Sequence, residues 1–264
     1  MYEFEFIRPK NIAGAVEALA SEDAQVLAGG QTLLPTMKQR LASPETLVSV
    51  AAIKEMIGLC TDDDGRLCIG AATTHAQVAA QSNYRALAQM AAHIGDPAVR
   101  NRGTIGGSLA NNDPAACYPS AVLASDATVV TNMREIPADA YFQGLFTTAL
   151  EEGELIIEVK FPIPEAACYK KFLQPASRFA LVGVFVAKFP DRCRVAVTGA
   201  SEDGVFRWSD AEEALNSEFS SDALASVLLE ADGMISDVHG SASYRSHIAG
   251  VMAQRAVSEI VAET

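Results

Sequence analysis

The sequence of 264 residues predicts an α+β protein built from several compact units, and three observations support this fold class. Near the amino terminus, a strand, a glycine turn, a helix and a second strand follow one another within ~30 residues, the size of a βαβ unit. In the middle, two short apolar runs flank the turn Asp62-Asp63-Asp64-Gly65, as in a hairpin. Near the carboxyl terminus, two strands precede helices that would pack on them. A composition shift places a boundary near residue 58, and the prolines at 162 and 164 that close a strand place a second near residue 166. We therefore expect units over 1–58, 59–165 and 166–264.

The expected elements follow from the alternating or helical spacing of apolar residues. Strands are expected over residues 4–7, 25–28, 47–50, 57–60, 67–70, 127–131, 155–161, 182–189 and 192–199. Helices are expected over residues 11–21, 33–41, 75–80, 84–94, 209–215, 221–231 and 244–262. The candidate helix caps are Asn11, Thr73 or Thr74, Ser209 and Ser221. Residues 136–142 and 144–150 are expected to form loops and turns.

Composition and charge exclude several classes of protein. An apolar content of 49% and a charged content of 20% are typical of a globular chain. The net charge of −13 argues against nucleic acid as a partner, because few cations are available to neutralise phosphates. No apolar run reaches the ~20 residues of a membrane span. The first six residues lack the basic region and apolar core of a signal peptide, so we expect a cytoplasmic protein.

Cysteine and histidine spacing does not predict a metal site. The five cysteines, at positions 60, 68, 117, 168 and 193, contain no CxxC pair, so neither an iron–sulfur cluster nor a structural zinc is expected. We expect reduced and mostly buried thiols. The four histidines, at 75, 93, 239 and 247, also lack ligand spacing and are interpreted as surface or core residues. The three aspartates at 62–64 lack the later ligands of a calcium loop, so a solvated turn is expected.

A glycine-rich stretch over residues 101–114 is the first candidate binding site. Gly103, Gly106 and Gly107 allow positive φ and the close approach of a ligand, and short polar side chains lie among them. Several N–H donors together suit a diphosphate. The alternative is a plain turn between two elements.

A second glycine turn, Ala28-Gly29-Gly30-Gln31-Thr32, follows a strand and leads into a helix. Two such turns could hold the two phosphates of one pyrophosphate from opposite sides. Neither turn matches a P-loop or a Rossmann dinucleotide motif. No serine nucleophile motif or His-Glu-x-x-His is present, and no acid/base pair is recognisable. We therefore expect no catalytic side chain, and chemistry supplied by a bound cofactor.

These segments resemble the FAD-binding medium subunit of molybdenum-containing hydroxylases, a group that includes carbon monoxide dehydrogenase and xanthine dehydrogenase. The resemblance covers essentially the whole chain in order. Its matching segments are residues 28–32, 101–110, 113–116, 144–148 and 176–184 and the pair Tyr244-Arg245. It implies an FAD-binding domain of the vanillyl-alcohol-oxidase (PCMH-like) type, with two α+β subdomains and the cofactor between them. A small α+β domain with an antiparallel sheet and helices would follow.

The resemblance also implies the residues that contact FAD. The residues implied at the pyrophosphate are Ala28, Gly29, Gly30, Gln31 and Thr32 in the first turn, with Thr104, Ile105, Gly106 and Gly107 in the second. Leu33, directly after the first turn, is also implied as a cofactor contact. Ser108 and Asn112 would lie along the ribityl chain and flavin. Leu155 would contact the adenine side or the ring, and either Lys171 or Gln174 would approach the flavin.

Two departures from the family pattern are visible. Relatives usually carry an acidic residue at the position of Cys117, where a carboxylate hydrogen-bonds the cofactor. Loss of one charge-assisted bond would cost about 1.5–3 kcal/mol, so we expect weaker or retuned FAD binding. The chain is also shorter around residues 132–135, where relatives have a longer hairpin, and we expect an effect on an edge turn only.

The resemblance implies an oxidoreductase subunit that transfers electrons. A molybdopterin-binding large subunit would hydroxylate the substrate, and a small subunit with 2Fe–2S clusters would relay electrons to FAD in this chain. The flavin would then reduce an external acceptor such as NAD, quinone or oxygen. Two alternatives keep the fold: a self-sufficient flavin oxidoreductase, and an assembly or binding module that has lost FAD.

Overall fold

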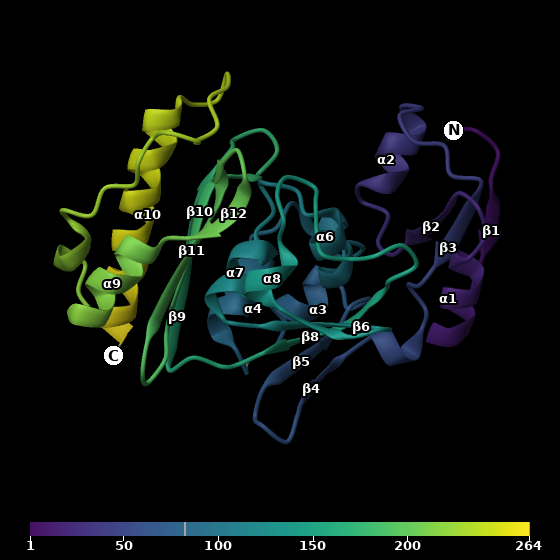
Figure 1. Cartoon of the computed structure of the whole chain (residues 1–264), viewed down its shortest axis with the longest axis horizontal. Helices are drawn as coiled ribbons and strands as arrows, with labels where there is room; N and C mark the ends of the chain where they lie inside the picture. The colour runs from purple at the N-terminus through teal and green to yellow at the C-terminus, as the bar shows by residue number, and fades with distance from the viewer. Residues whose placement is uncertain (82, 264) are drawn as a thin grey trace.

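The computed structural model describes residues 1–81 and 83–263. The chain forms three sheets in succession, and Figure 1 shows them from the amino-terminal strands at one end to the carboxyl-terminal helix α10 at the other. Helices and strands are mixed in all three parts, which confirms the α+β class. Among the described helices, none combines the length and apolar character needed to cross a bilayer.

The amino-terminal part is a parallel sheet of three strands in the order β1-β3-β2. Its elements are β1 (Glu5–Ile7), α1 (Ile12–Leu19), β2 (Ala24–Leu27), α2 (Leu33–Lys38) and β3 (Thr46–Ser49). The predicted order of strand, glycine turn, helix and strand is confirmed. Asn11 caps α1 as predicted, because its side-chain oxygen accepts the N–H of Gly14 at 2.8 Å.

The middle part is an antiparallel sheet of five strands in the order β4-β5-β8-β6-β7, covered by helices on one face (Figure 1). Its strands are β4 (Leu59–Thr61), β5 (Leu67–Gly70), β6 (Thr128–Thr131), β7 (Glu135–Pro137) and β8 (Ile156–Phe161). Its helices are the 3-10 turn η1 (Lys54–Met56), α3 (His75–Ala79), α4 (Arg85–Ala92), α5 (Pro97–Arg100), α6 (Ile105–Asn111), α7 (Tyr118–Ala124) and α8 (Ala138–Tyr141). The predicted hairpin at residues 57–70 is confirmed.

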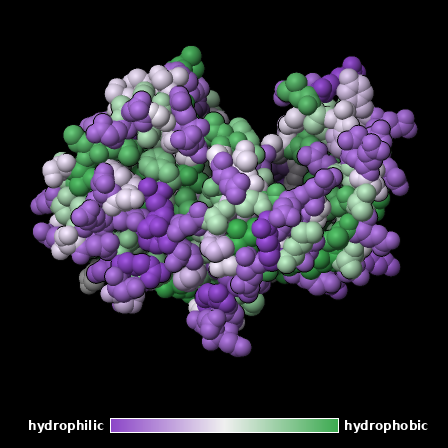
Figure 2. Space-filling model, viewed as in Figure 1, coloured by the Kyte–Doolittle hydropathy of each residue, from purple (hydrophilic) through white to green (hydrophobic). Residues whose placement is uncertain are grey.

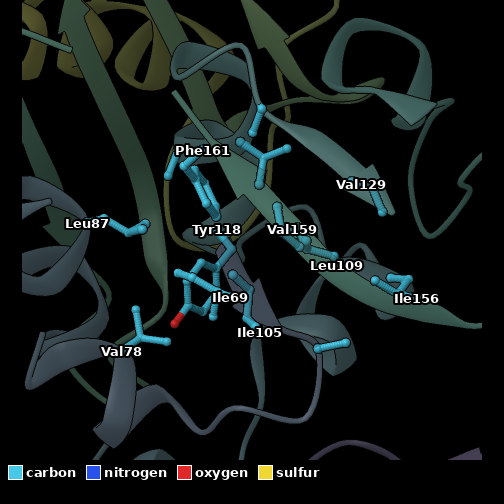
Figure 3. Packing of buried hydrophobic residues seen from close by; sticks show 14 of the residues in the cluster. Ile69, Val78, Leu87, Ile105, Leu109, Tyr118, Val129, Ile156, Val159 and Phe161 are labelled. Carbon is cyan, nitrogen blue, oxygen red and sulfur yellow. The ribbon is translucent and has the colours of Figure 1, made fainter. Parts of the chain in front are cut away.

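The core of this part holds α6 on the sheet. Ile105 and Leu109 of α6 are fully buried, as are Ile69 of β5 and Val159 of β8. Figure 3 shows these side chains gathered in one cluster with Tyr118 of α7. Because α6 lies within the glycine-rich stretch 101–114 and begins directly after Thr104, this packing fixes the position of the second glycine turn.

Several helices of the middle part escaped prediction. Thr74 rather than Thr73 caps α3, through a capping box with Gln77. The short helices α5, α6 and α7 were not predicted, because each has fewer than two turns and carries no long apolar period. Residues 136–142, expected to be loop, contain the end of β7 and the helix α8; β7 forms because it pairs with β6.

The carboxyl-terminal part is an antiparallel sheet in the order β12-β11-β10-β9. Its elements are β9 (Ala166–Leu173), β10 (Ala180–Lys188), β11 (Cys193–Ser201), β12 (Gly204–Arg207), α9 (Ser209–Ser217), η2 (Asp222–Leu224) and α10 (Ala242–Glu263). Val184 of β10 packs in the cluster with α10, whereas Phe185 packs in the cluster with α7. Both faces of β10 are therefore covered, which explains its continuous apolar sequence.

The predicted helix over residues 221–231 is wrong, since only η2 forms there. The chain instead returns to the end of the inner strand β11, where the N–H of Ile235 donates to the carbonyl of Ala200 at 2.7 Å. Strand β9 was not predicted, although it pairs with β10 over eight residue pairs. The division into 1–58, 59–165 and 166–264 stays our proposed domain division.

Candidate functional site

The first glycine turn joins β2 to α2 and leaves its backbone donors free. Gly30 has a φ of 69°, a left-handed conformation that glycine adopts without steric cost. Within the described residues, the N–H groups of five consecutive residues donate to no acceptor, namely Gly29, Gly30, Gln31, Thr32 and Leu33. Free N–H groups that converge before a helix suit an anion, because several donors act on the same charge.

The second glycine turn leads into α6, and its first N–H groups are already paired. The Thr104 hydroxyl caps the helix by accepting the N–H of Gly107 at 3.1 Å. The N–H groups of Ile105 and Gly106 donate at 3.1 and 2.9 Å to carbonyls of the connection 71–73. The expectation of exposed N–H groups is therefore wrong at these three residues, because the cap and the connection use them.

The glycines of the second turn provide space rather than unusual backbone angles. Gly103, Gly106 and Gly107 all have negative φ, contrary to expectation. A Cβ on Gly103 would lie 2.6 Å from Nε2 of His75, and one on Gly106 would lie 2.6 Å from Cβ of Ala71. These two glycines therefore allow α6 and its preceding turn to pack closely on the middle part.

His75 supports the second turn as a buried, neutral ring. It is 5% exposed, and its ring lies against Tyr118 with centroids 5.3 Å apart. Burial lowers the pKa of His75 to about 4, and the charge of Arg100 acts in the same direction. Its Nδ1 has no hydrogen-bond partner among the described residues. The sequence did not predict this neighbourhood, because 28 positions separate His75 from Gly103.

The two glycine turns lie in direct contact. A Cβ on Gly29 would be only 2.0 Å from the carbonyl oxygen of Arg102, and one on Gly107 would be 3.7 Å from Cβ of Ala28. Figure 2 shows a hollow in the surface between the parts that carry α2 and α6 in Figure 1. The fold therefore brings the two predicted segments together where the surface is open.

Polar side chains of α6 differ in how they are used. The Ser108 hydroxyl is half-buried and bonds no group in the described part of the chain. Asn112 is 3% exposed and ends the helix with a φ of 41°. Its amide nitrogen donates to the carbonyls of Gly144 and Thr147, at 2.9 and 2.8 Å. Asn112 thus fixes the loop 143–148 beside α6, and its predicted place along the flavin stays a prediction.

Cys117 and Lys171 lie in contact with each other. The Lys171 ammonium donates to the carbonyls of His93 and Arg178, at 2.7 and 3.0 Å, and lies 3.5 Å from Sγ of Cys117. Cys117 is 5% exposed. The ammonium of Lys171 therefore connects α4, α7 and the turn after β9, and its predicted approach to the flavin stays a prediction.

Leu155 lies in the core of the middle part, 5% exposed. Its N–H donates to Oδ1 of Asn132 at 2.7 Å. The preceding Glu154 accepts from Arg134 Nε and Thr131 Oγ1, at 3.0 and 2.7 Å, and these bonds lower its pKa to about 2. This network closes the turn between β6 and β7, and the expected shortening of that turn relative to the family stays a prediction. The predicted cofactor contact of Leu155 stays a prediction.

A second opening lies between the end of α6 and the carboxyl-terminal part. It has a volume of about 370 Å³, and its lining includes Asp113, Pro114, Gln174 and Phe179. Oε1 of Gln174 accepts the N–H groups of Ala176 and Ser177, which fixes the turn after β9. Lys171 is not among the lining residues, whereas Gln174 is. Of the two residues left open from the sequence, only Gln174 reaches this cleft.

Arg245 fixes one wall of the cleft, although its position in the sequence did not predict a site residue. Its guanidinium donates to the carbonyls of Leu181 and Gly199, at 2.7 and 2.8 Å, and to both oxygens of Asp237 at 2.8 Å. The side chain is 4% exposed. Such a buried, multiply bonded arginine fixes backbone geometry. Its signal in the sequence was the pair Tyr244-Arg245, one of the segments that carry the family resemblance.

Comparison with known proteins gives consistent matches over the whole chain. Residues 2–164 match the family described as the FAD binding domain in molybdopterin dehydrogenase. The carbon monoxide dehydrogenase medium chain of Hydrogenophaga pseudoflava is 32% identical, with 97% of this chain and 96% of that protein covered. The nicotine 6-hydroxylase medium subunit of Paenarthrobacter nicotinovorans is also 32% identical, with 98% of each covered. The structure of reconstituted carbon monoxide dehydrogenase from Oligotropha carboxidovorans aligns with a TM-score of 0.90 at 31% identity, over 100% of both chains.

The fold and the paired glycine turns define a flavoprotein subunit of an oxidoreductase. FAD is its cofactor. The chain belongs to the family of FAD-binding medium subunits of molybdenum hydroxylases.

Proposed function

We propose that this chain is the electron-transfer subunit of a molybdenum-containing hydroxylase or dehydrogenase. It takes electrons from the iron–sulfur clusters of a partner subunit and passes them to an external acceptor. The observation that carries the proposal is the contact of Gly29 with Arg102, which joins the two glycine turns at an open surface. Bound FAD supplies the redox chemistry, because a flavin can exchange electrons singly or in pairs.

The FAD pyrophosphate binds at the paired turns in this proposal. The free N–H groups of residues 29–33 are its main donors. The exposed backbone of Gly107 and the hydroxyl of Ser108 face it from α6. Thr104, Ile105 and Gly106 act by building the start of α6, since their bonds are made within the chain. The first glycine turn therefore provides N–H donors, and the second glycine turn provides a close-packed wall.

The flavin lies toward the cleft between α6 and the carboxyl-terminal part in this proposal. Gln174 and the half-exposed ring of Phe179 are the nearest candidates for contact, because both line the cleft. Lys171 and Asn112 are positioning residues, since their polar atoms hold neighbouring loops. Cys117 joins them through Lys171, at the position where the family resemblance implies an acid.

The proposed partners are a molybdopterin-binding large subunit and a small subunit with 2Fe–2S clusters. Two relatives are named as the medium chain or medium subunit of their enzymes, which supports a complex of several chains. The formal charge of −13 leaves nucleic acid outside this proposal. A cytoplasmic location stays a prediction.

The test is to purify the chain alone and together with the two proposed partners, and to record flavin absorbance. We expect FAD in both preparations, and reduction of the flavin by a substrate of the complex only when both partners are present. Reduction by a small substrate with the chain alone would favour a self-sufficient flavin oxidoreductase. A chain that cannot be loaded with FAD would contradict the proposed function.

A further inference from the structure

Two cysteines and a glutamate gather on the outer face of the middle sheet, away from the paired glycine turns. Cys60 of β4 lies directly opposite Cys68 of β5 in the strand register. Cys68 and Glu158 share the face of the sheet opposite the core, since the alternating residues Leu67, Ile69 and Val159 pack inside. Sγ of Cys60, Sγ of Cys68 and a carboxylate oxygen of Glu158 all lie within 4.8 Å of one another.

The strand register does not favour a disulfide between these cysteines. Hydrogen bonds join Asp62 to Arg66 and Gly58 to Gly70, two positions to either side. The pair Cys60–Cys68 is therefore also a hydrogen-bonded pair, whose Cβ atoms are normally about 5.5 Å apart. A disulfide needs Cβ atoms about 3.5–4.5 Å apart. Two thiolates bound to one zinc ion, each at ~2.3 Å from the metal, have their sulfur atoms ~3.8 Å apart. A shared zinc ion therefore requires less movement of the two strands than a disulfide does.

The charges around the cluster leave Glu158 available. Within the described part of the chain, the Glu158 carboxylate has no hydrogen bond or ion pair. The neighbouring Lys160 forms an ion pair with Glu135 at 2.6 Å, and Arg66 forms an ion pair with Asp62 at 2.8 Å. No hydrogen bond or ion pair of the described residues holds this half-buried carboxylate, and Lys160, which lies opposite Cys68 in the register, gives its ammonium to Glu135. Two thiols beside such a carboxylate form a set of ligands for a cation rather than for an anion.

We propose that Cys60, Cys68 and Glu158 form a binding site for a borderline-soft divalent cation, with Zn²⁺ as its occupant. Two sulfurs and one carboxylate oxygen select Zn²⁺ over the hard cations Mg²⁺ and Ca²⁺. The fourth position of the tetrahedron is open to water. Bound zinc would fasten the edge strand β4 to β5 and β8, because each strand gives one ligand. The sequence did not predict this site, since the hairpin separates the two cysteines by eight positions and Glu158 comes from a distant strand.

The test uses the purified full chain, treated with a chelator under reducing conditions. Zn²⁺ is then titrated by calorimetry, and Cd²⁺ is bound and observed by cadmium NMR, whose shift reports sulfur ligands. We expect one Zn²⁺ per chain and a cadmium signal of a sulfur-containing site. Cys60→Ser should weaken Zn²⁺ binding roughly 100-fold, since one of four ligands is lost. Glu158→Gln should weaken binding at least ~10-fold and keep the sulfur signature.

Cys193→Ser is the matched control, because it removes a thiol of the carboxyl-terminal sheet, outside the cluster. It should leave Zn²⁺ affinity unchanged. Cys60 is exposed, so Cys60→Ser should fold normally, which circular dichroism checks. Equal affinity in the wild type and Cys60→Ser, or a cadmium signal without sulfur ligands, would overturn the proposal. If two thiols are lost in air before metal is added, the two cysteines form a disulfide instead of a metal site, and this result would also overturn the proposal.

Discussion

Gly29 packs so closely on Arg102 that the space for a side chain is missing: a Cβ on Gly29 would lie 2.0 Å from the Arg102 carbonyl oxygen. Gly29 lies in a connection of the amino-terminal sheet and Arg102 in a connection of the middle part, and the two residues are 73 positions apart in the chain. Their contact makes one site from two glycine turns.

Gly29→Ala should therefore separate the turns. Overpacking of this kind costs about 1–3 kcal/mol, and we expect FAD affinity to fall ten- to a hundredfold while the sheets remain folded. Flavin content per chain and a fluorescence titration with FAD measure the effect. Gly250→Ala is the matched control, because no atom lies within 4 Å of its added Cβ in α10. It should keep FAD and gain about 0.5–1 kcal/mol of stability. Unchanged FAD affinity in Gly29→Ala would mean that contact between the turns does not shape the site.

Removal of the Arg245 side chain should destabilise the fold more than removal of an exposed arginine. Arg245→Met leaves the carbonyls of Leu181 and Gly199 unpaired, so we expect a loss of about 3–5 kcal/mol in the free energy of unfolding. Urea unfolding followed by circular dichroism measures it. Arg85→Ala is the control, since Arg85 is 68% exposed in its pair with Glu263, and its loss should be within about 0.5 kcal/mol. Similar losses of unfolding free energy in both variants would show that the buried hydrogen bonds of Arg245 add little to stability.

His75 should make the fold sensitive to acid. Burial lowers its pKa from 6.5 to about 4, so between these pH values the unfolded chain binds more protons than the folded chain. Stability therefore falls as the pH falls, and the loss between pH 7 and 4.5 from this residue is about 2 kcal/mol. Unfolding free energies of the wild type and His75→Gln at several pH values check this. The variant should lack this part of the pH dependence, and parallel curves would contradict the assignment.

Cys117→Asp should place a carboxylate where the family resemblance implies one. The new carboxylate would face the Lys171 ammonium, which now lies 3.5 Å from the sulfur. If residue 117 also reaches the cofactor, one charge-assisted bond of about 1.5 kcal/mol should tighten FAD about tenfold. Cys117→Ser is the control and should leave FAD affinity as it is. Greater stability without tighter FAD binding would mean that residue 117 contacts Lys171 and does not reach the cofactor.

Local patterns were enough to identify the two glycine turns, the amino-terminal βαβ order and the hairpin at residues 57–70. These features depend on short-range chemistry, such as the cap at Asn11 and the apolar strands beside each turn. The same patterns missed α6 and α7, because short helices depend on tertiary packing more than on periodicity. They also assigned a helix to residues 221–231, after which the chain returns to bond the end of strand β11.

The sequence by itself determined the class of protein and its cofactor, because the glycine motifs and their order are linear features. Tertiary structure decided how each residue is used. Gly30 alone among the five motif glycines needs a positive φ, whereas Gly29, Gly103 and Gly106 are required by close contacts with segments distant in the chain. Only the folded chain shows that the free N–H groups lie on the first turn. In the second turn, the N–H groups of Ile105 and Gly106 donate to carbonyls of another connection, and that of Gly107 donates to the Thr104 hydroxyl. Tertiary packing decides which carbonyls accept these N–H groups, and a local sequence pattern does not contain that information.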